Sequence, residues 1–244
     1  MKIVVIGDLH AHPDYDLKRF EEAGRLVAQE QPDVVVQIGD WADMCSINSH
    51  GSKLELESRR LREDIEVTRE SLALFDDPIR KRKKKLPRKV LTKGNHEFFI
   101  DRLVAQHPNL QSSVSVEQLG FSEFGWEVHE YRRAVEIAGF HFVHHLGSQT
   151  GRAARVDSPS NGVRAMGVST VVGHSHTYAR VPVPYKHRRI WGLDVGFLIH
   201  KDMGYFEHWS CDTAYKYWRG VVILNNAAHG DADISEIRAE TLGV

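Results

Sequence analysis

The sequence predicts an α/β fold built on a parallel sheet, and three observations support this. Residues 3–6 and 34–38 are short apolar runs rich in Val and Ile, typical of buried strands. A helical pattern lies between them, and strand, helix and strand in this order form a βαβ unit with parallel strands. These two runs, and two later ones, lead to a glycine followed by an acid, an amide or an imidazole.

The first half of the chain continues this alternation of strands and helices. Apolar residues on one face predict a helix over 16–29, formed by Leu17, Phe20, Ala23, Gly24 and Val27. The same spacing predicts a long helix over 53–75, with Leu54, Leu61, Ile65, Leu72 and Phe75 in a narrow arc. A third strand is expected over 90–92, and a short helix over 98–106 that ends ahead of Pro108.

The second half is richer in strands, and we expect them at 127–129, 133–137, 141–143, 168–172, 179–183, 189–193 and 220–224. No internal repeat, low-complexity block or linker interrupts the chain. We therefore expect one domain spanning residues 1–244.

Composition excludes several classes of protein. Hydrophobic residues make up 41% of the chain, which is too many for a mostly disordered protein. No stretch approaches the roughly 18 apolar residues of a membrane helix, and the first apolar run is too short for a signal peptide. Cys45 and Cys211 lack metal-pair spacing, and a disulfide framework is not expected. We expect a soluble, cytoplasmic protein without a membrane partner, and the net charge of −1 predicts no partner by itself.

The chain contains 15 histidines, and many of them follow the strand-like runs. The polar clusters are Gly7-Asp8-Leu9-His10, Gly39-Asp40-Trp41-Ala42-Asp43, Gly94-Asn95-His96-Glu97, His144-His145 and Gly173-His174-Ser175-His176. Open α/β sheets place their sites beyond the carboxyl ends of the strands, so these clusters are expected to converge on one site.

The residue types in these clusters suit a pair of divalent ions. Carboxylate, amide oxygen and imidazole are typical ligands of such ions. The candidate ligands are Asp8, His10, Asp40, Asn95, His144, His174 and His176. If the two ions share one carboxylate, each has four protein ligands and retains open positions for water and substrate, which is the arrangement of a catalytic site. We expect two Mn²⁺ ions, with Fe, Zn or Ni as alternatives.

In order and spacing, the clusters resemble the calcineurin-like metallophosphoesterase superfamily, whose pattern GDxH, GDxxD, GNH(E/D), H and GHxH is present from Asp8 to His176. The resemblance implies a four-layer α/β/β/α sandwich with a dinuclear site. It also implies that Asp8, His10 and His176 bind the first ion. Asn95, His144 and His174 would bind the second, and Asp40 would bridge the two.

The resemblance further implies that His96 is not a ligand but faces the scissile phosphate as a general acid or charge stabiliser, with Asp43 as its partner carboxylate. A carboxylate beside one ring nitrogen fixes the tautomer and favours the imidazolium form. His144 and His145 compete for the fourth cluster, and we choose His144 because it directly follows the strand. His12 is interpreted as a turn residue, with contact to substrate as the alternative.

The sequence departs from the family's protein phosphatases after the second cluster. Those enzymes continue it as Asp-Arg-Gly, whereas Met44 and Cys45 follow Asp43 here, which argues against a protein phosphatase. Arg152 and Arg155 are the candidate substrate-binding residues, with Arg164 beside them in the sequence. A solvated surface is the alternative interpretation for each.

We therefore expect a phosphodiesterase that acts on nucleotides or nucleic acid by in-line attack of a hydroxide held between the ions. A small-molecule phosphomonoesterase and a non-catalytic scaffold are the alternatives. Residues 80–85 form a basic run that is either a nucleic-acid contact or a solvated loop. An aromatic stretch is either a base-stacking platform or packing, and consists of Tyr205, Phe206, Trp209, Tyr215, Tyr217 and Trp218.

Overall fold

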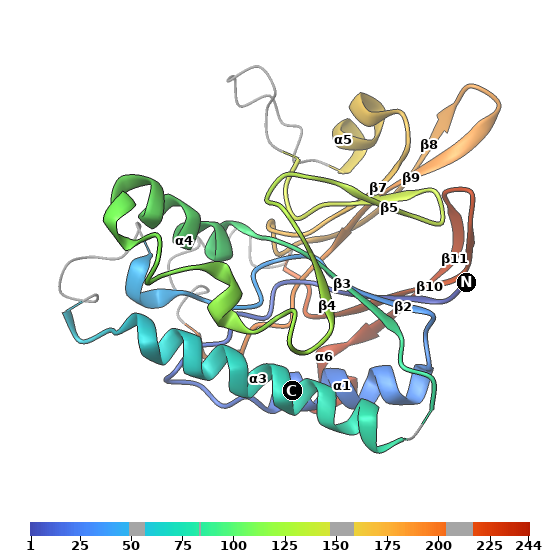
Figure 1. The fold of residues 1–244 in the computed structure, drawn as a ribbon. Helices are drawn as coiled ribbons and strands as arrows, with labels where there is room; N and C mark the ends of the chain where they lie inside the picture. The colour runs from blue at the N-terminus through green and yellow to red at the C-terminus, as the bar shows by residue number, and fades with distance from the viewer. Residues whose placement is uncertain (49–56, 83, 147–158, 204–216) are drawn as a thin grey trace.

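The computed structural model describes residues 1–48, 57–82, 84–146, 159–203 and 217–244. Two β-sheets pack face to face, and helices cover the outer face of each (Figure 1). This confirms the α/β class and the four-layer α/β/β/α architecture. Among the described residues, no helix has the length and apolar character needed to span a bilayer.

The first sheet has six strands in the order β11-β10-β1-β2-β3-β4. They are β1 (Ile3–Ile6), β2 (Val34–Gln37), β3 (Arg88–Thr92), β4 (Trp126–His129), β10 (Gly220–Ala228) and β11 (Asp231–Arg238). Strands β1 to β4 are parallel, and β10 is antiparallel to β1. The parallel strands therefore bring the segments after β1, β2, β3 and β4 to one edge of the sheet.

The second sheet has five strands in the order β5-β6-β7-β9-β8. They are β5 (Val135–Ile137), β6 (Phe140–Phe142), β7 (Ser169–Val172), β8 (Tyr178–Tyr185) and β9 (Arg188–Val195). Strands β6, β7 and β9 are parallel. Apolar side chains of both sheets, including Val5, Val36, Phe140 and Leu193, fill the space between them.

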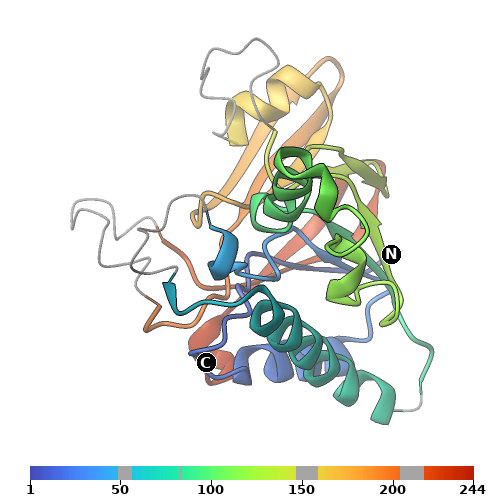
Figure 2. The same ribbon diagram turned by 60° about the vertical axis from the view of Figure 1, so that its left-hand side comes forward.

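The outer layers hold the helices. They are α1 (Lys18–Glu30), α3 (Leu61–Lys81), α4 (Asn95–Gln106), α5 (Pro159–Met166) and α6 (Ala239–Leu242), with short 3-10 turns η1 (Cys45–Ile47), η2 (Pro108–Leu110) and η3 (Val116–Leu119). Helices α1 and α3 lie side by side under the first sheet (Figure 2), and α5 packs on the second. Trp41 lies within the second cluster, directly after Asp40, and its ring centroid is 5.3 Å from those of Phe20, Phe75 and Trp126. The aromatic core thus holds in place the loop after β2, which carries Asp40 and Asp43.

Most predicted elements are found within a few residues of their expected bounds, but the long helix was misplaced. Residues 53–56 lie outside the described part of the chain, and Arg60 is extended, with φ −131° and ψ 132°. The helix begins at Leu61 and continues through Pro78 to Lys81. It extends past 75 because Ile79, four residues after Phe75, is buried and continues the apolar face.

Three elements were missed by the sequence analysis. Strand β11 lies at the edge of its sheet and has mostly exposed or half-buried side chains, so it lacks a clear apolar run. Helices α5 and α6 are only two turns or less. Tyr217 and Trp218, from the aromatic stretch, precede β10, which begins at Gly220 as expected.

We predict that Gly24→Ala destabilises the protein although alanine is the better helix former. A Cβ at Gly24 in α1 would lie 2.1 Å from the main-chain oxygen of Phe75 in α3, so the two helices would have to move apart. The free energy of unfolding should fall by about 1–3 kcal/mol, measured by urea denaturation. A more stable variant would show that helix propensity, worth about 1 kcal/mol, outweighs the close approach.

Candidate metal centre

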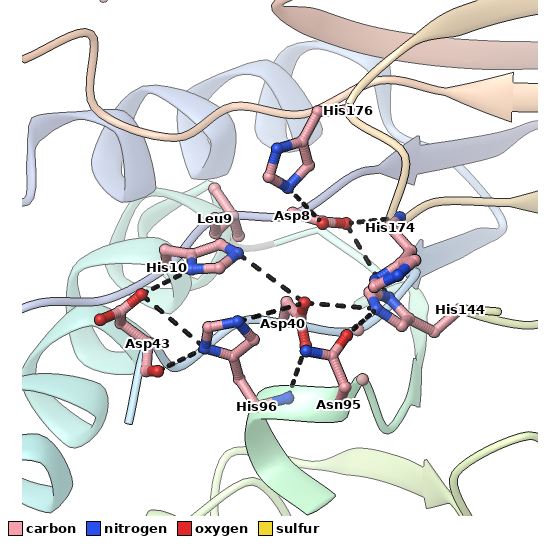
Figure 3. Close-up of polar contacts among 12 residues, drawn as sticks. Asp8, Leu9, His10, Asp40, Asp43, Asn95, His96, His144, His174 and His176 are labelled. Carbon is pink, nitrogen blue, oxygen red and sulfur yellow. Dashed lines mark hydrogen bonds and ion pairs between the residues drawn. The ribbon is translucent and has the colours of Figure 1, made fainter. Parts of the chain in front are cut away.

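The structure brings all seven predicted ligands to the edge where the parallel strands of both sheets end (Figure 3). Asp8 follows β1, Asp40 follows β2 and Asn95 follows β3. His144 follows β6, and His174 and His176 follow β7. The first sheet thus supplies three carboxylate or amide groups together with His10, and the second sheet supplies the other imidazoles.

The ligand atoms of Asp8, His10 and His176 lie within 4.8 Å of one another, and all three side chains are buried. His176 Nε2 is 2.9 Å from Asp8 Oδ2. The ring of His10 meets that of His176 edge-on, with centroids 5.9 Å apart. These are the three residues predicted to hold the first ion.

A second group contains Asp40, His144 and His174, again within 4.8 Å. His144 Nε2 lies 3.2 Å from Asp40 Oδ2 and 3.0 Å from the Asn95 amide oxygen. One imidazole nitrogen therefore faces two oxygen acceptors. Asp40 also groups with His10 on its other side, so its carboxylate lies between the two predicted ion positions.

The choice between His144 and His145 now has a physical basis. His144 is fully buried, and its Nδ1 donates a hydrogen bond to the Ile38 carbonyl oxygen at 2.9 Å. Because Nδ1 is engaged in this bond, Nε2 is the nitrogen that faces Asp40 and Asn95, and it would lose its proton and offer its lone pair to a bound cation. His145 is half-buried, and its ring packs 4.8 Å from that of His174. The geometry favours His144.

Asp43 contacts His96 through both its carboxylate and its main-chain oxygen. The Asp43 carboxylate bonds His10 Nδ1 at 2.7 Å, and it is 3.8 Å from His96 Nδ1. His96 Nδ1 instead donates to the Asp43 main-chain oxygen at 2.5 Å. Because a carbonyl oxygen can only accept, the proton is on Nδ1 of His96, and Nε2 faces Asp40 Oδ2 at 3.9 Å.

Charge balance in the site is provided by imidazoles. Burial alone would raise the pKa of Asp40, but His144 and His96 outweigh it and hold that pKa well below its usual value. Burial likewise opposes protonation of His144, yet Asp40 and Asp8 raise its pKa to about 9. Among the described residues, neither Asp8 nor Asp40 is paired with a lysine or arginine. Buried carboxylates that face only imidazole and amide groups match the preferences of divalent cations.

The backbone is strained where it carries the candidate ligands. His10, Asp40, His174 and His176 have φ values between +51° and +68°, a region that non-glycine residues rarely adopt. The chain also passes very close to itself here, since a Cβ at Gly94 would lie 2.0 Å from Asp40 Oδ1. Strain of this kind persists only where surrounding contacts enforce it.

Two buried acids that the sequence analysis did not single out supply those contacts. The Glu97 carboxylate accepts hydrogen bonds from the main-chain N–H groups of Asp40 and Ala42 at 3.0 Å and of Gly94 at 2.8 Å. It explains why α4 begins at residue 95 rather than 98, since Glu97 caps that turn.

The second buried acid is Asp194 on β9. Its carboxylate accepts hydrogen bonds from the hydroxyl groups of Ser175 and Thr177, which flank the strained His176. Asp194 is fully buried, and burial raises its pKa to about 7. The sequence analysis did not identify Asp194 as a residue that supports the His174–His176 turn, because the two are well separated in the sequence.

A further group of possible ligands, His12, Asp43 and Cys45, does not suit a metal. His12 Nδ1 accepts the Asp14 N–H at 3.1 Å, so the proton of the neutral ring is on Nε2, which faces Asp43. The Cys45 thiol donates to Asp64 at 3.1 Å, and burial raises its pKa, which disfavours the thiolate.

The remaining candidate residues are either outside the described part of the chain or not among the two ligand groups. Arg152, Arg155 and Cys211 fall outside the described residues, as do Tyr205, Phe206, Trp209 and Tyr215. Arg164 is exposed on α5, and Trp218 packs 4.8 Å from Tyr178.

The described residues of the basic run lie at and just after the end of α3, far from the sheet edge that carries the candidate ligands (Figure 1). Arg80 and Lys81 pair there with Asp76 and Asp77, and Arg82 bonds the main-chain oxygen of Ala28. These contacts agree with the interpretation of the run as a solvated surface.

The chain is similar to a known protein family, to two phage proteins and to a solved structure. The family model described as calcineurin-like phosphoesterase matches residues 1–178. The Gene 54 protein of Mycobacterium phage L5 is 26% identical over 223 residues, which cover 84% of this chain and 82% of that protein. The Gene 54 protein of Mycobacterium phage D29 is 24% identical over 225 residues, with the same coverage of 84% and 82%. One crystal structure aligns over 97% of this chain and 98% of its own, at 10% identity and a TM-score of 0.46.

We predict that Asp194→Ala weakens metal binding without unfolding the protein. Without the carboxylate, the Ser175 and Thr177 hydroxyls lose their common acceptor, and the strained turn carrying His174 and His176 can relax. Loss of a group that orients ligands typically lowers metal affinity about 10- to 100-fold. Competition with a chelating dye measures this, and Asp233→Ala, which removes an exposed carboxylate, is the control. Equal affinity in both variants would contradict the role given to Asp194.

Proposed function

The chain belongs to the calcineurin-like phosphoesterase family and is a metal-dependent phosphoesterase, and we propose that it cleaves phosphodiesters of nucleotides or nucleic acid. The observation that carries the proposal is the chemistry around the two ligand groups. They contain imidazole, carboxylate and amide groups, and within the described part of the chain neither carboxylate, Asp8 or Asp40, pairs with a lysine or arginine. A phosphodiester has one negative charge, whereas a phosphomonoester is largely a dianion at neutral pH and needs more cationic contacts.

Two arginines on this side of the fold are engaged in other contacts. Arg19 is buried and donates to the main-chain oxygens of Leu9 and His10 at 2.9 and 2.6 Å. Arg59 pairs with Asp14 at 2.6 Å. These contacts support a diester substrate over the monoester alternative.

In the proposed site, the seven ligands would hold two Mn²⁺ ions, because Mn²⁺ accepts this mixture of oxygen and nitrogen donors. When bound, such a pair activates water and stabilises charge on a phosphoryl group. His96 holds a proton on Nδ1 through the Asp43 main-chain oxygen, which directs Nε2 toward the substrate side. Burial lowers the pKa of His96, but Asp40 and Asp43 outweigh it and raise that pKa, which favours the imidazolium form. Nε2 then also carries a proton, which it would donate to the leaving oxygen of the diester. His10 is oriented by the Asp43 carboxylate, so Asp43 acts as a positioning residue.

The first test compares hydrolysis of bis-p-nitrophenyl phosphate and p-nitrophenyl phosphate by protein stripped with chelator and reloaded with Mn²⁺. We expect diester cleavage to dominate, to require metal and to be absent in Asp40→Asn. Faster monoester cleavage would support the phosphomonoesterase instead. If neither substrate is hydrolysed while metals are bound, the protein is a scaffold.

A second prediction separates metal binding from proton transfer. Asp40→Ala should abolish turnover and reduce bound metal, because its carboxylate lies between the two ligand groups. His96→Ala should retain the metal and lower kcat by about 10²- to 10⁴-fold, as expected for loss of a general acid. Elemental analysis of both purified variants measures the difference. Equal metal loss in the two would refute the division of roles.

A further inference from the structure

An aromatic and cationic stack lies beside the candidate metal centre. The rings of Phe98 and Tyr131 are stacked with centroids 4.8 Å apart and an interplanar angle of 27°. The guanidinium carbon of Arg132 lies over the Tyr131 ring, 5.0 Å from its centroid. Phe98 and Tyr131 are half-buried, and Arg132 is exposed. The stack holds an arginine at the surface in a defined position.

Two more arginines extend this surface. Arg102 is four residues after Phe98 on α4, so it lies on the same helix face, and Arg133 follows Arg132; both are exposed. Within the described part of the chain, none of the three arginines forms an ion pair. The two neighbouring acids, Asp101 and Glu130, are both bonded to Lys93, at 2.9 and 2.7 Å. The surface formed by Phe98, Arg102, Tyr131, Arg132 and Arg133 therefore has excess positive charge.

The fold places this aromatic–arginine surface next to the ligands of the second predicted ion. Phe98 is in the first turn of α4, three residues after Asn95. Strand β4 pairs with β3 so that His129 lies beside Thr92, and the Lys93 N–H donates to the His129 oxygen at 2.9 Å. Tyr131 thus leaves the sheet at the same edge as the Asn95 loop. One side of the surface is on α4, which begins with Asn95, and the other side follows β4, the strand that pairs with β3.

We propose that this aromatic–arginine surface binds the nucleotides that flank the scissile bond of a single-stranded nucleic acid. The inference rests on the proposed function and adds the region that selects long substrates. Guanidinium groups bind backbone phosphates with two hydrogen bonds. The Tyr131 ring lies between Phe98 and the Arg132 guanidinium, so it supports an arginine whose outer face can stack on an unpaired base without regard to sequence. A small diester at the metal centre would not extend to Arg102 or Arg133, whereas a strand would cross them.

The first test measures binding, in the Asp40→Asn background so that the strand stays intact. Fluorescence anisotropy of labelled oligothymidylate of about 12 nucleotides, within the site sizes of single-strand binders, reports the Kd. Arg132→Ala/Arg133→Ala should raise Kd at least about tenfold and lower the salt slope by about 1.4, the value for two phosphate contacts. Tyr131→Ala should raise Kd about tenfold, and Tyr131→Phe should restore binding because the ring is retained.

A matched control also removes two positive charges, but at the opposite edge of the second sheet from β5, the strand that follows Arg133. Lys186 lies in the turn between β8 and β9 and Arg188 is the first residue of β9; both are exposed, and Lys186 lies 5.5 Å from the centroid of the Tyr185 ring. Lys186→Ala/Arg188→Ala should leave Kd and salt slope unchanged. If this control weakens binding as much as Arg132→Ala/Arg133→Ala, the strand responds to overall charge and the proposal is wrong.

Turnover gives an independent measurement, in the chain with Asp40 intact. For Arg132→Ala/Arg133→Ala, the ratio of kcat/KM for the oligonucleotide to kcat/KM for bis-p-nitrophenyl phosphate should fall about tenfold, in line with the binding change. An unchanged ratio would overturn the proposal, because the small diester would depend on the surface equally. If the unaltered chain cleaves neither substrate, the proposed function fails, and the binding measurements alone decide the role of the surface.

Discussion

The buried carboxylate of Glu97 is the contact on which the site depends. It accepts hydrogen bonds from main-chain groups of two loops that follow neighbouring strands, β2 and β3. Those loops must approach within a distance that only glycine permits at position 94. Without an internal acceptor, three buried N–H groups would lack partners, which is costly in a protein interior. One side chain thus satisfies the backbone and sets the separation between Asp40 and Asn95.

The core reinforces this arrangement from the other side. Trp41 directly follows Asp40 and is held by three aromatic rings and by a hydrogen bond to Ser71 at 2.8 Å. The residues around the candidate ions are therefore attached to rigid parts of the protein, although four of them have left-handed backbones. The left-handed conformations occur in the turns that direct the ligands inward. For Asp40, the packing that maintains this conformation is that of the next residue, Trp41.

Much of this could be predicted from the sequence because the motifs follow apolar strands in a fixed order. From the order of the motifs alone, Asp8, Asp40 and Asn95 could be predicted to lie at one edge of the sheet. The four-layer architecture was implied by the resemblance to the family. What could not be predicted depends on contacts between distant residues. Asp194 acts on a turn about twenty positions earlier, and Asp43 contacts His96 through a main-chain oxygen, for which residue type carries no signal. Strand β11 was missed because a half-exposed edge strand lacks a clear apolar run. The start of α3 was placed too early because Leu54 fits the apolar spacing of the helix that begins at Leu61.

The candidate ligands come from both sheets, which has a consequence for stability. Asp8, His10, Asp40 and Asn95 belong to the first sheet, whereas His144, His174 and His176 belong to the second. Bound ions would join the two sheets at this edge, where they otherwise adhere through the apolar layer between them. By thermodynamic linkage, ions at 100 times their dissociation constant would add about 2.7 kcal/mol per independent site to the free energy of unfolding. Metal availability in the cell would then set the lifetime of the folded chain as well as its activity.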